Sequence, residues 1–212
     1  MINLGSPDST SIPDVKKYLD EFLMDKRVIG KSYIFRWILV KLIILNTRPK
    51  KSAKAYKKIW WKEGSPLIVL SERLFNKVEK ALDIPVALAM RYGSISINKG
   101  INKLVNKGIN EILVLPLYPH YAMSSYETVV EKVKEEVNDN FPDVKIKIVP
   151  PFYQNDQYID LLSSKIFNTI KKIQYDHILF SYHGIPVSHL KISDTTNNHC
   201  YKTNDCCNVK SA

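Results

Sequence analysis

The sequence lacks the features that define several large classes of protein. It has three cysteines among 212 residues, all within the last thirteen positions, which excludes a disulfide framework. It has seven glycines but neither of the two common glycine-rich phosphate loops, which argues against a nucleotide enzyme. It also has no serine elbow, no paired-histidine zinc helix and no cluster of carboxylates. These absences direct attention to single side chains in the loops that follow the predicted strands.

The sequence also lacks a run of apolar residues long enough to cross a membrane. The most apolar window, Tyr33–Leu45, is interrupted by Arg36 and Lys41 and is shorter than the ~20 residues that a spanning helix needs. We predict either a buried helix or a helix that lies on a membrane surface. No signal-peptide pattern follows Met1, so we expect a cytoplasmic protein.

Basic residues exceed acidic residues by 31 to 21, which gives a net charge of +10. Such an excess suits nucleic acid or an anionic membrane surface. The lysines are scattered among asparagines and isoleucines rather than clustered, which favours a general lysine bias, and we expect no nucleic-acid partner. A hydrophobic fraction of 45% with 25% charged residues is that of an ordinary globular protein.

Strand and helix patterns alternate along most of the chain. Strands are expected at residues 2–4, 85–90, 111–117, 144–148 and 178–181, with helical patterns between them. This order predicts an α/β protein, with parallel sheets covered by helices on both faces. Pro150-Pro151 is the best candidate for a boundary, which predicts domains at residues 1–149 and 150–212.

The carboxyl ends of the predicted strands are rich in tyrosine, histidine and glycine. They read Leu4-Gly5-Ser6-Pro7, Arg91-Tyr92-Gly93, Leu117-Tyr118-Pro119-His120-Tyr121, Pro151-Phe152-Tyr153 and Tyr182-His183-Gly184-Ile185-Pro186. Ligands of open α/β sheets bind beyond these ends. An aromatic rim of this kind suits a large flat ligand better than a phosphate. His183 follows an apolar run that predicts a buried strand, so it is expected at the mouth of this site.

Several of these motifs together resemble the ferrochelatase family. The resemblance rests on Asn3-Leu4-Gly5-Ser6-Pro7, Phe22-Leu23-Met24-Asp25, Gly64-Ser65-Pro66-Leu67, Met90-Arg91-Tyr92-Gly93, Leu115-Pro116-Leu117-Tyr118-Pro119-His120-Tyr121 and Ser181-Tyr182-His183-Gly184-Ile185-Pro186, in that order. It implies two Rossmann-like half-domains with a porphyrin between them, and insertion of ferrous iron into protoporphyrin IX. It also implies that the chain is an N-terminal fragment whose second half-domain is incomplete.

The resemblance assigns roles to individual residues. His183 matches the active-site histidine, which either ligates Fe²⁺ or accepts a proton from a pyrrole N–H. The other matched positions are Leu4 on the wall facing the macrocycle, Arg48 near the propionates, and Tyr56, Ser65 and Tyr121 in the substrate cleft. A purely structural role is the alternative for the arginine and the tyrosines. The arginine could cap the carboxyl end of the preceding helix, and the tyrosines could be half-buried residues of the core.

The family pairs its histidine with a glutamate in a Ser-Glu-His-like segment, and this sequence has no such segment. The chain alone is therefore expected to be inactive. Some bacterial members hold a [2Fe–2S] cluster through cysteines, which makes Cys200, Cys206 and Cys207 candidate cluster or zinc ligands, with free thiols as the alternative. Iron itself is expected as a substrate.

The family's hydrophobic lip falls at Tyr33–Leu45, which implies a peripheral contact with the inner membrane as one alternative to a purely cytoplasmic protein. Other readings are a coproporphyrin ferrochelatase, a cobalt or sirohydrochlorin chelatase, and a non-catalytic porphyrin-binding fragment. The sequence gives no oligomeric state.

Overall fold

The computed structural model describes residues 1–194, 196 and 199–206. The chain divides into two compact units. Unit 1 comprises residues 1–118 and 124–150, and unit 2 comprises residues 119–123 and 151–212. Each unit is considered by itself below.

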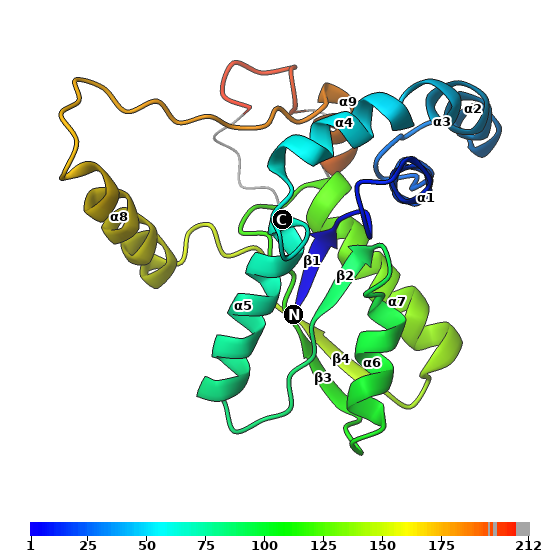
Figure 1. Ribbon diagram of the computed structural model, residues 1–212, viewed down its shortest axis with the longest axis horizontal. Helices are drawn as coiled ribbons and strands as arrows, with labels where there is room; N and C mark the ends of the chain where they lie inside the picture. The colour runs from blue at the N-terminus through cyan, green and yellow to red at the C-terminus, as the bar shows by residue number, and fades with distance from the viewer. Residues whose placement is uncertain (195, 197–198, 207–212) are drawn as a thin grey trace. The chain divides into compact units, whose positions relative to one another are not determined.

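Two small parallel sheets, linked by an isolated bridge between Ile2 and Pro116, form the centre of unit 1 (Figure 1). Their strands are β1 (Ile2–Gly5), β2 (Ala89–Tyr92), β3 (Glu111–Val114) and β4 (Lys145–Ile148). β1 pairs with β2, and β3 pairs with β4. The two pairs are joined beyond β3, where Ile2 bonds to the backbone of Leu115 and Leu117 at N···O distances of 2.9 and 2.7 Å. The strands thus follow the order β2-β1-β3-β4.

Helices cover these sheets on both sides, with α5 on one side and α6 and α7 on the other (Figure 1). In chain order, the helices of the described residues are α1 (Ile12–Leu23), α2 (Tyr33–Trp37), the π-helix η1 (Ile38–Ile44), α3 (Leu45–Thr47), α4 (Pro49–Ile59), α5 (Pro66–Ala81), α6 (Ile97–Val105), the π-helix η2 (Met123–Glu127), α7 (Thr128–Asn140), α8 (Asp156–Ile170) and α9 (Val187–Ser193). The predicted α/β class, with parallel strands between helices, is confirmed.

The main core lies between the strands and helices α6 and α7. It consists of aliphatic side chains that the strand and helix periodicities bring to one layer: Ile2, Ala89, Ile97, Ile101, Val114, Val129 and Val133. Burying one such isoleucine or valine completely stabilises the fold by roughly 1.5–3 kcal/mol. β4 borders this core, with Lys145 and Lys147 exposed and the alternating Ile146 and Ile148 half-buried.

One strand departs from its predicted environment. The sequence predicted parallel sheets covered by helices on both faces, yet Leu113 of β3 is 65% exposed. Ile112, the residue before it, points to the opposite face and packs against the core. In the described part of the chain, Leu113 is not packed into the core, so the prediction is wrong for this face of β3.

The predicted strand before His183 is absent from unit 2. The run from Ile178 to Ser181 has neither helix nor strand, and Leu179 is 92% exposed. A parallel strand needs a neighbour to satisfy its N–H and C=O groups, and the described residues of unit 2 form no other strand. Helix α8 likewise has no buried residue, although it carries a stripe of apolar side chains. The described part of unit 2 therefore has helices but no sheet.

The window Tyr33–Leu45 is helical as predicted, but much of it faces solvent. Arg36, Val40 and Leu45 point inward and are buried, whereas Ile34 is 72% exposed. Arg36 and Val40 are four residues apart, a spacing that brings them to the same side of the helical turns of α2 and η1. Within the residues described, no helix combines the length and apolarity required to cross a bilayer.

Candidate active site

The carboxyl ends of β1 and β2 approach each other closely, and Gly5 makes this possible. Gly5 has a φ of +103°, and a Cβ atom placed on it would lie 1.9 Å from the carbonyl oxygen of Tyr92. No other residue fits without separating the strands. The hydroxyl of Tyr18 on α1 donates to the Gly5 carbonyl at 3.3 Å, so a neighbouring helix also fixes this turn. The tight Leu4-Gly5-Ser6-Pro7 segment thus forms the floor of a site at this edge.

Aromatic rings and a buried ion pair pack around the Gly5 turn. The rings of Tyr18, Phe22 and Tyr92 meet with centroids 5.2–6.4 Å apart. Asp25 accepts hydrogen bonds from the Arg91 guanidinium and, at 3.0 Å, from the Tyr92 hydroxyl. Both partners of the Asp25–Arg91 pair are largely buried. Burial raises the pKa of both Tyr18 and Tyr92, so these phenols stay neutral.

A small polar cavity of about 200 Å³ opens beyond these strand ends. Ser6, Trp60, Ser65 and Tyr92 are among its lining residues. Ser6 and Ser65 are both buried, and the Ser6 hydroxyl has no hydrogen-bond partner among the described residues. Ligand pockets commonly measure ~300–1,000 Å³. Unit 1 therefore supplies a space that fits part of a flat ligand rather than a whole macrocycle.

Four of the predicted site residues lie in unit 1. Ser65 is the N-cap residue of α5, makes no side-chain capping bond and lines the cavity. Leu4 is half-buried in β1, one residue before the Gly5 turn. Tyr56 is half-buried on α4, where its ring meets Trp60 edge-on at 6.1 Å, and burial raises its pKa. Arg48 is exposed at the junction of α3 and α4. The fold thus gathers Leu4 and Ser65 near one edge of the sheet.

The remaining predicted residues lie in unit 2. Tyr121 belongs to the segment of residues 119–123, which two backbone hydrogen bonds join to the segment that begins at residue 151. The N–H groups of Phe152 and Tyr153 donate to the Pro119 carbonyl at 2.9 and 3.0 Å. The His120 ring also stacks on Tyr153 with centroids 5.3 Å apart. His183 is exposed, in a stretch without helix or strand.

The cysteines do not form a ligand set for a cluster in the described part of the chain. Cys200 and Cys206 are half-buried free thiols, and Cys207 lies outside the described residues. No group of three or more histidine, cysteine or acidic side chains with metal-binding geometry occurs among the residues described. A [2Fe–2S] cluster takes four thiolates and the sequence has three. The residues present therefore do not fit a cluster held by this chain alone.

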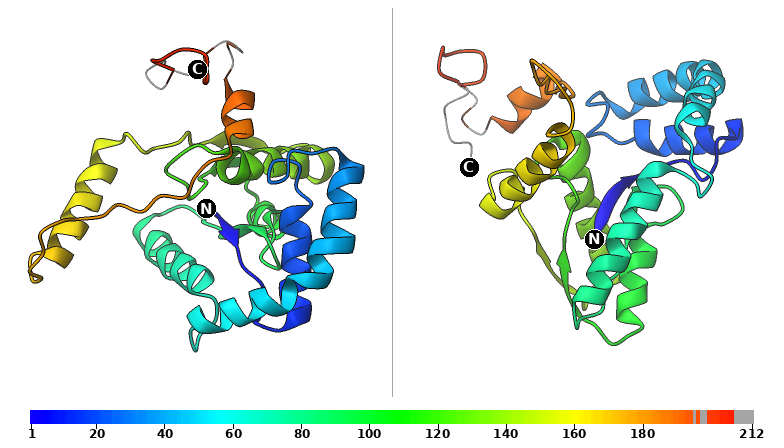
Figure 2. Two further views of the ribbon diagram at one scale, coloured as in Figure 1. Left: turned by 90° about the horizontal axis from the view of Figure 1, so that it is seen from above. Right: turned by 60° about the vertical axis from the view of Figure 1, so that its left-hand side comes forward.

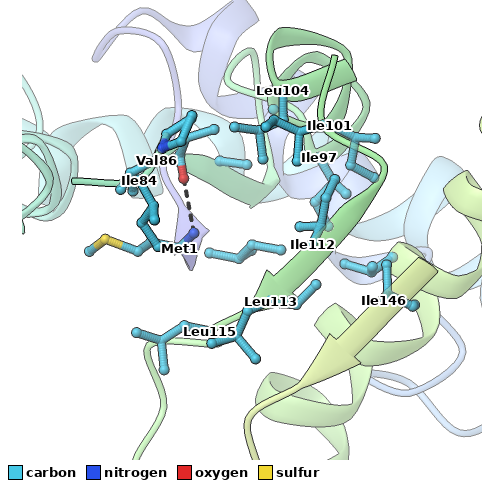
Figure 3. A pocket seen from close by; sticks show the side chains of 18 of the residues that line it. Met1, Ile84, Val86, Ile97, Ile101, Leu104, Ile112, Leu113, Leu115 and Ile146 are labelled. Carbon is cyan, nitrogen blue, oxygen red and sulfur yellow. Dashed lines mark hydrogen bonds between the residues drawn. The ribbon is translucent and has the colours of Figure 1, made fainter. Parts of the chain in front are cut away.

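A larger cavity of about 370 Å³ lies at the other end of the strands of unit 1 (Figure 3). Its labelled side chains are mainly aliphatic, among them Ile84 and Val86 before β2, Leu113 on β3 and Ile146 on β4. None of the predicted site residues lines it. Apart from Glu111 and Met1, whose amino group is also at this end, the lining residues of this cavity are apolar, so the smaller polar cavity is the better candidate.

Two features of this edge were not singled out from the sequence. Ser6 was quoted within a motif, but its buried, unpaired hydroxyl became evident only from the packing. Asp25 and Arg91 each occur in a quoted motif, and their ion pair joins the segment after α1 to β2 across 66 positions of sequence. Their common signal was membership of the ordered motif series.

Comparison with known proteins gives the same family for the chain as a whole. The ferrochelatase family profile matches residues 1–210. The chain is 49% identical to a ferrochelatase of Opitutus terrae and 46% and 45% identical to two from Pseudomonas fluorescens, covering 100% of this chain each time. It spans 62% of the length of each of these relatives. The chain belongs to the ferrochelatase family.

Proposed function

We propose that this chain is part of a ferrochelatase that inserts Fe²⁺ into protoporphyrin IX to give protohaem, at the last step of haem synthesis. The observation that carries the proposal is the match of the whole chain, at 49% identity, to a protein named ferrochelatase. The geometry of unit 1 supports it, because a polar cavity lies beyond the carboxyl ends of β1 and β2. Ser65 contributes a hydroxyl to this cavity. Leu4, one residue before the Gly5 turn, is proposed as an apolar wall facing the macrocycle.

Metal insertion replaces two pyrrole N–H protons by one Fe²⁺ ion, so the site must bind a cation and remove protons. A neutral imidazole does either, because its unprotonated nitrogen is a ligand for Fe²⁺ and a base near neutral pH. His183 is the proposed residue for this role. Arg48 is exposed, as a group that pairs with a propionate at the cleft mouth must be. Tyr56 and Tyr121 are proposed to contact the macrocycle.

We propose further that the second half-domain begins at residue 150 and is incomplete in these 212 residues. The exposed run before His183 and the unburied α8 support this, because both are apolar patterns without a core. No glutamate follows His183 in the sequence, the last one being Glu136. The 212 residues alone are therefore expected to bind porphyrin without metallating it.

The exposed side chains of α2 and η1 are proposed as a peripheral contact with a membrane. Ile34 and Leu42 expose more than half of their surface, which is unusual for neighbouring aliphatic residues on a helix. Replacing both by serine is expected to weaken sedimentation with phosphatidylcholine vesicles at least about fivefold. The matched control replaces Leu161 and Ile173 of unit 2 by serine, because these two aliphatic residues are exposed to a similar extent. Equal losses in both variants would contradict the contact.

A chimaera tests the activity directly. In it, this chain replaces the matched 62% of the Opitutus terrae ferrochelatase. We expect it to metallate protoporphyrin with Fe²⁺ under anaerobic conditions. The shift of the porphyrin absorption bands measures this reaction. Parallel reactions with coproporphyrin, and with Co²⁺ and sirohydrochlorin, separate the alternative substrates. Failure with protoporphyrin together with turnover of another macrocycle would overturn the choice of substrate, and failure with all three would overturn the activity.

A further inference from the structure

The positive charge of the chain is concentrated in one segment. Residues 26–62 contain twelve of the 31 basic residues and none of the 21 acidic residues. The rest of the chain therefore has 19 basic and 21 acidic residues, a net charge of −2. The whole net charge of +10 thus comes from 37 consecutive residues. The interpretation of the lysines as scattered rather than clustered is wrong for this segment.

Helix α4 presents much of this charge on one face. Its inward side carries Pro49 and Ala53, which are buried, and Tyr56, which is half-buried. Its opposite side carries five exposed lysines within little more than two turns: Lys50, Lys51, Lys54, Lys57 and Lys58. The salt bridges recorded for the described residues involve none of them. Five lysines at this spacing repel one another, and an anionic surface would relieve that repulsion.

The lysine face and the exposed apolar side chains belong to one group of helices. Helix α1 packs against both α4 and η1, and α3 connects η1 to α4. The buried faces of η1 and α4 carry Val40 and Ala53, so their exposed faces are the sides left without protein contacts. Figures 1 and 2 show α1, α2, α3 and α4 together beyond the carboxyl end of β1. Cationic and apolar side chains are therefore available on the same end of unit 1.

We infer that α4 binds the headgroups of anionic phospholipids while the exposed side chains of α2 and η1 enter the adjoining apolar layer. This inference rests on the membrane contact proposed above and adds its headgroup chemistry. A surface that joins lysines to exposed aliphatic and aromatic residues has the composition of an interfacial helix. On a nucleic acid, side chains such as Ile34 and Leu42 would stay in water, so a phosphate backbone fits the lysines but not their neighbours.

The test is co-sedimentation of the 212-residue chain with vesicles. One set is pure phosphatidylcholine, and the other contains about one-third phosphatidylglycerol. The variant changes four lysines of the exposed face to glutamine: Lys50, Lys54, Lys57 and Lys58. The control removes the same charge from exposed lysines elsewhere in unit 1: Lys77, Lys80, Lys107 and Lys147. Circular dichroism checks that both variants retain helix.

Each lysine near an anionic surface contributes about a fivefold gain in partitioning. We therefore expect the α4 variant to bind phosphatidylglycerol vesicles at least tenfold more weakly, and the control to change less than about threefold. Equal binding of the unchanged chain to both vesicle types would overturn the headgroup inference and leave the membrane contact standing. Binding to neither would overturn both. Binding of duplex DNA that depends on the α4 lysines, without vesicle binding, would identify a nucleic-acid surface instead.

Discussion

The tightest backbone contact at the candidate site is that of Gly5 with β2, and replacing Gly5 by alanine tests its importance. The new Cβ atom would lie 1.9 Å from the Tyr92 carbonyl oxygen and 2.9 Å from its carbonyl carbon. Both atoms belong to the backbone of a paired strand, so no side-chain rotation relieves the clash. Relief requires β1 and β2 to separate at their carboxyl ends, which also breaks the bond from Tyr18.

The size of the effect follows from two contributions. An alanine with φ near +100° is strained by about 1–3 kcal/mol even in open space. Separating the strand ends adds lost hydrogen bonds and packing, for a total of at least about 4 kcal/mol. A domain of this size loses about 2–4 °C of Tm per kcal/mol. We therefore expect Gly5→Ala to lower the Tm by at least about 8 °C, or to prevent folding.

Gly108→Ala is the matched control, because Gly108 also has a positive φ, of +78°, but nothing lies within 4 Å of the position that a Cβ atom would take there. The Tm of the Gly108→Ala protein is expected to fall by only about 2–6 °C. Thermal unfolding followed by far-ultraviolet circular dichroism measures both. A Gly5→Ala protein that melts no lower than the Gly108→Ala protein would refute the close approach of the two strands at the floor of the site.

Two further predictions concern charged groups of unit 1. Asp25→Asn is expected to lower the free energy of unfolding in urea by about 3 kcal/mol, because it leaves the buried guanidinium of Arg91 without its carboxylate. Glu63→Gln breaks the exposed pair with Arg73 and should lower it by less than about 1 kcal/mol. Similar losses in the two variants would contradict the burial of the Asp25–Arg91 pair. A hydrogen bond from Lys134 lowers the pKa of Glu131. Burial acts to raise the pKa of Glu136, but hydrogen bonds from Asn98 and Lys132 outweigh burial, so this pKa is also lowered. Their contribution to stability is therefore complete above the ordinary glutamate pKa of about 4.3 and is lost as the pH falls below it. Changing both to glutamine should flatten the acid limb of the stability curve, and an unchanged acid limb would contradict these shifts.

Local patterns predicted unit 1 well because its elements find their partners within the chain. The Ser11 hydroxyl accepts a bond from the Asp14 N–H at 3.2 Å, which caps the start of α1. The strand expected at residues 144–148 is β4, with its lysines exposed and its isoleucines half-buried. In both cases the interactions that decide the structure are a few residues or one strand away.

The sequence was misleading where an apolar pattern has no partner in the described residues. The run before His183 has the composition of a buried strand, but a strand is stabilised by its neighbours rather than by its own residues. Leu113 illustrates the same point on a single face of β3. Composition alone also hid the charge asymmetry, because a net charge of +10 does not reveal that residues 26–62 carry all of it.

The candidate site was predictable as a set of strand ends but not as a geometry. The motif series identified Leu4, Ser65 and His183 by position, and the fold assigns the first two to unit 1 and the third to unit 2. The buried hydroxyl of Ser6 and the ion pair of Asp25 depend on long-range packing, which no local pattern encodes.

The central claim is that His183 serves iron insertion, and the chimaera described above tests it with one comparison. His183→Ala is compared with His177→Ala, which removes another exposed histidine six positions earlier in the same unit. General acid–base catalysis by one side chain is worth about 10²–10⁴ in rate. We predict that kcat for Fe²⁺ and protoporphyrin falls at least 100-fold in His183→Ala and less than about threefold in His177→Ala. Retention of near-normal kcat by His183→Ala would contradict the account.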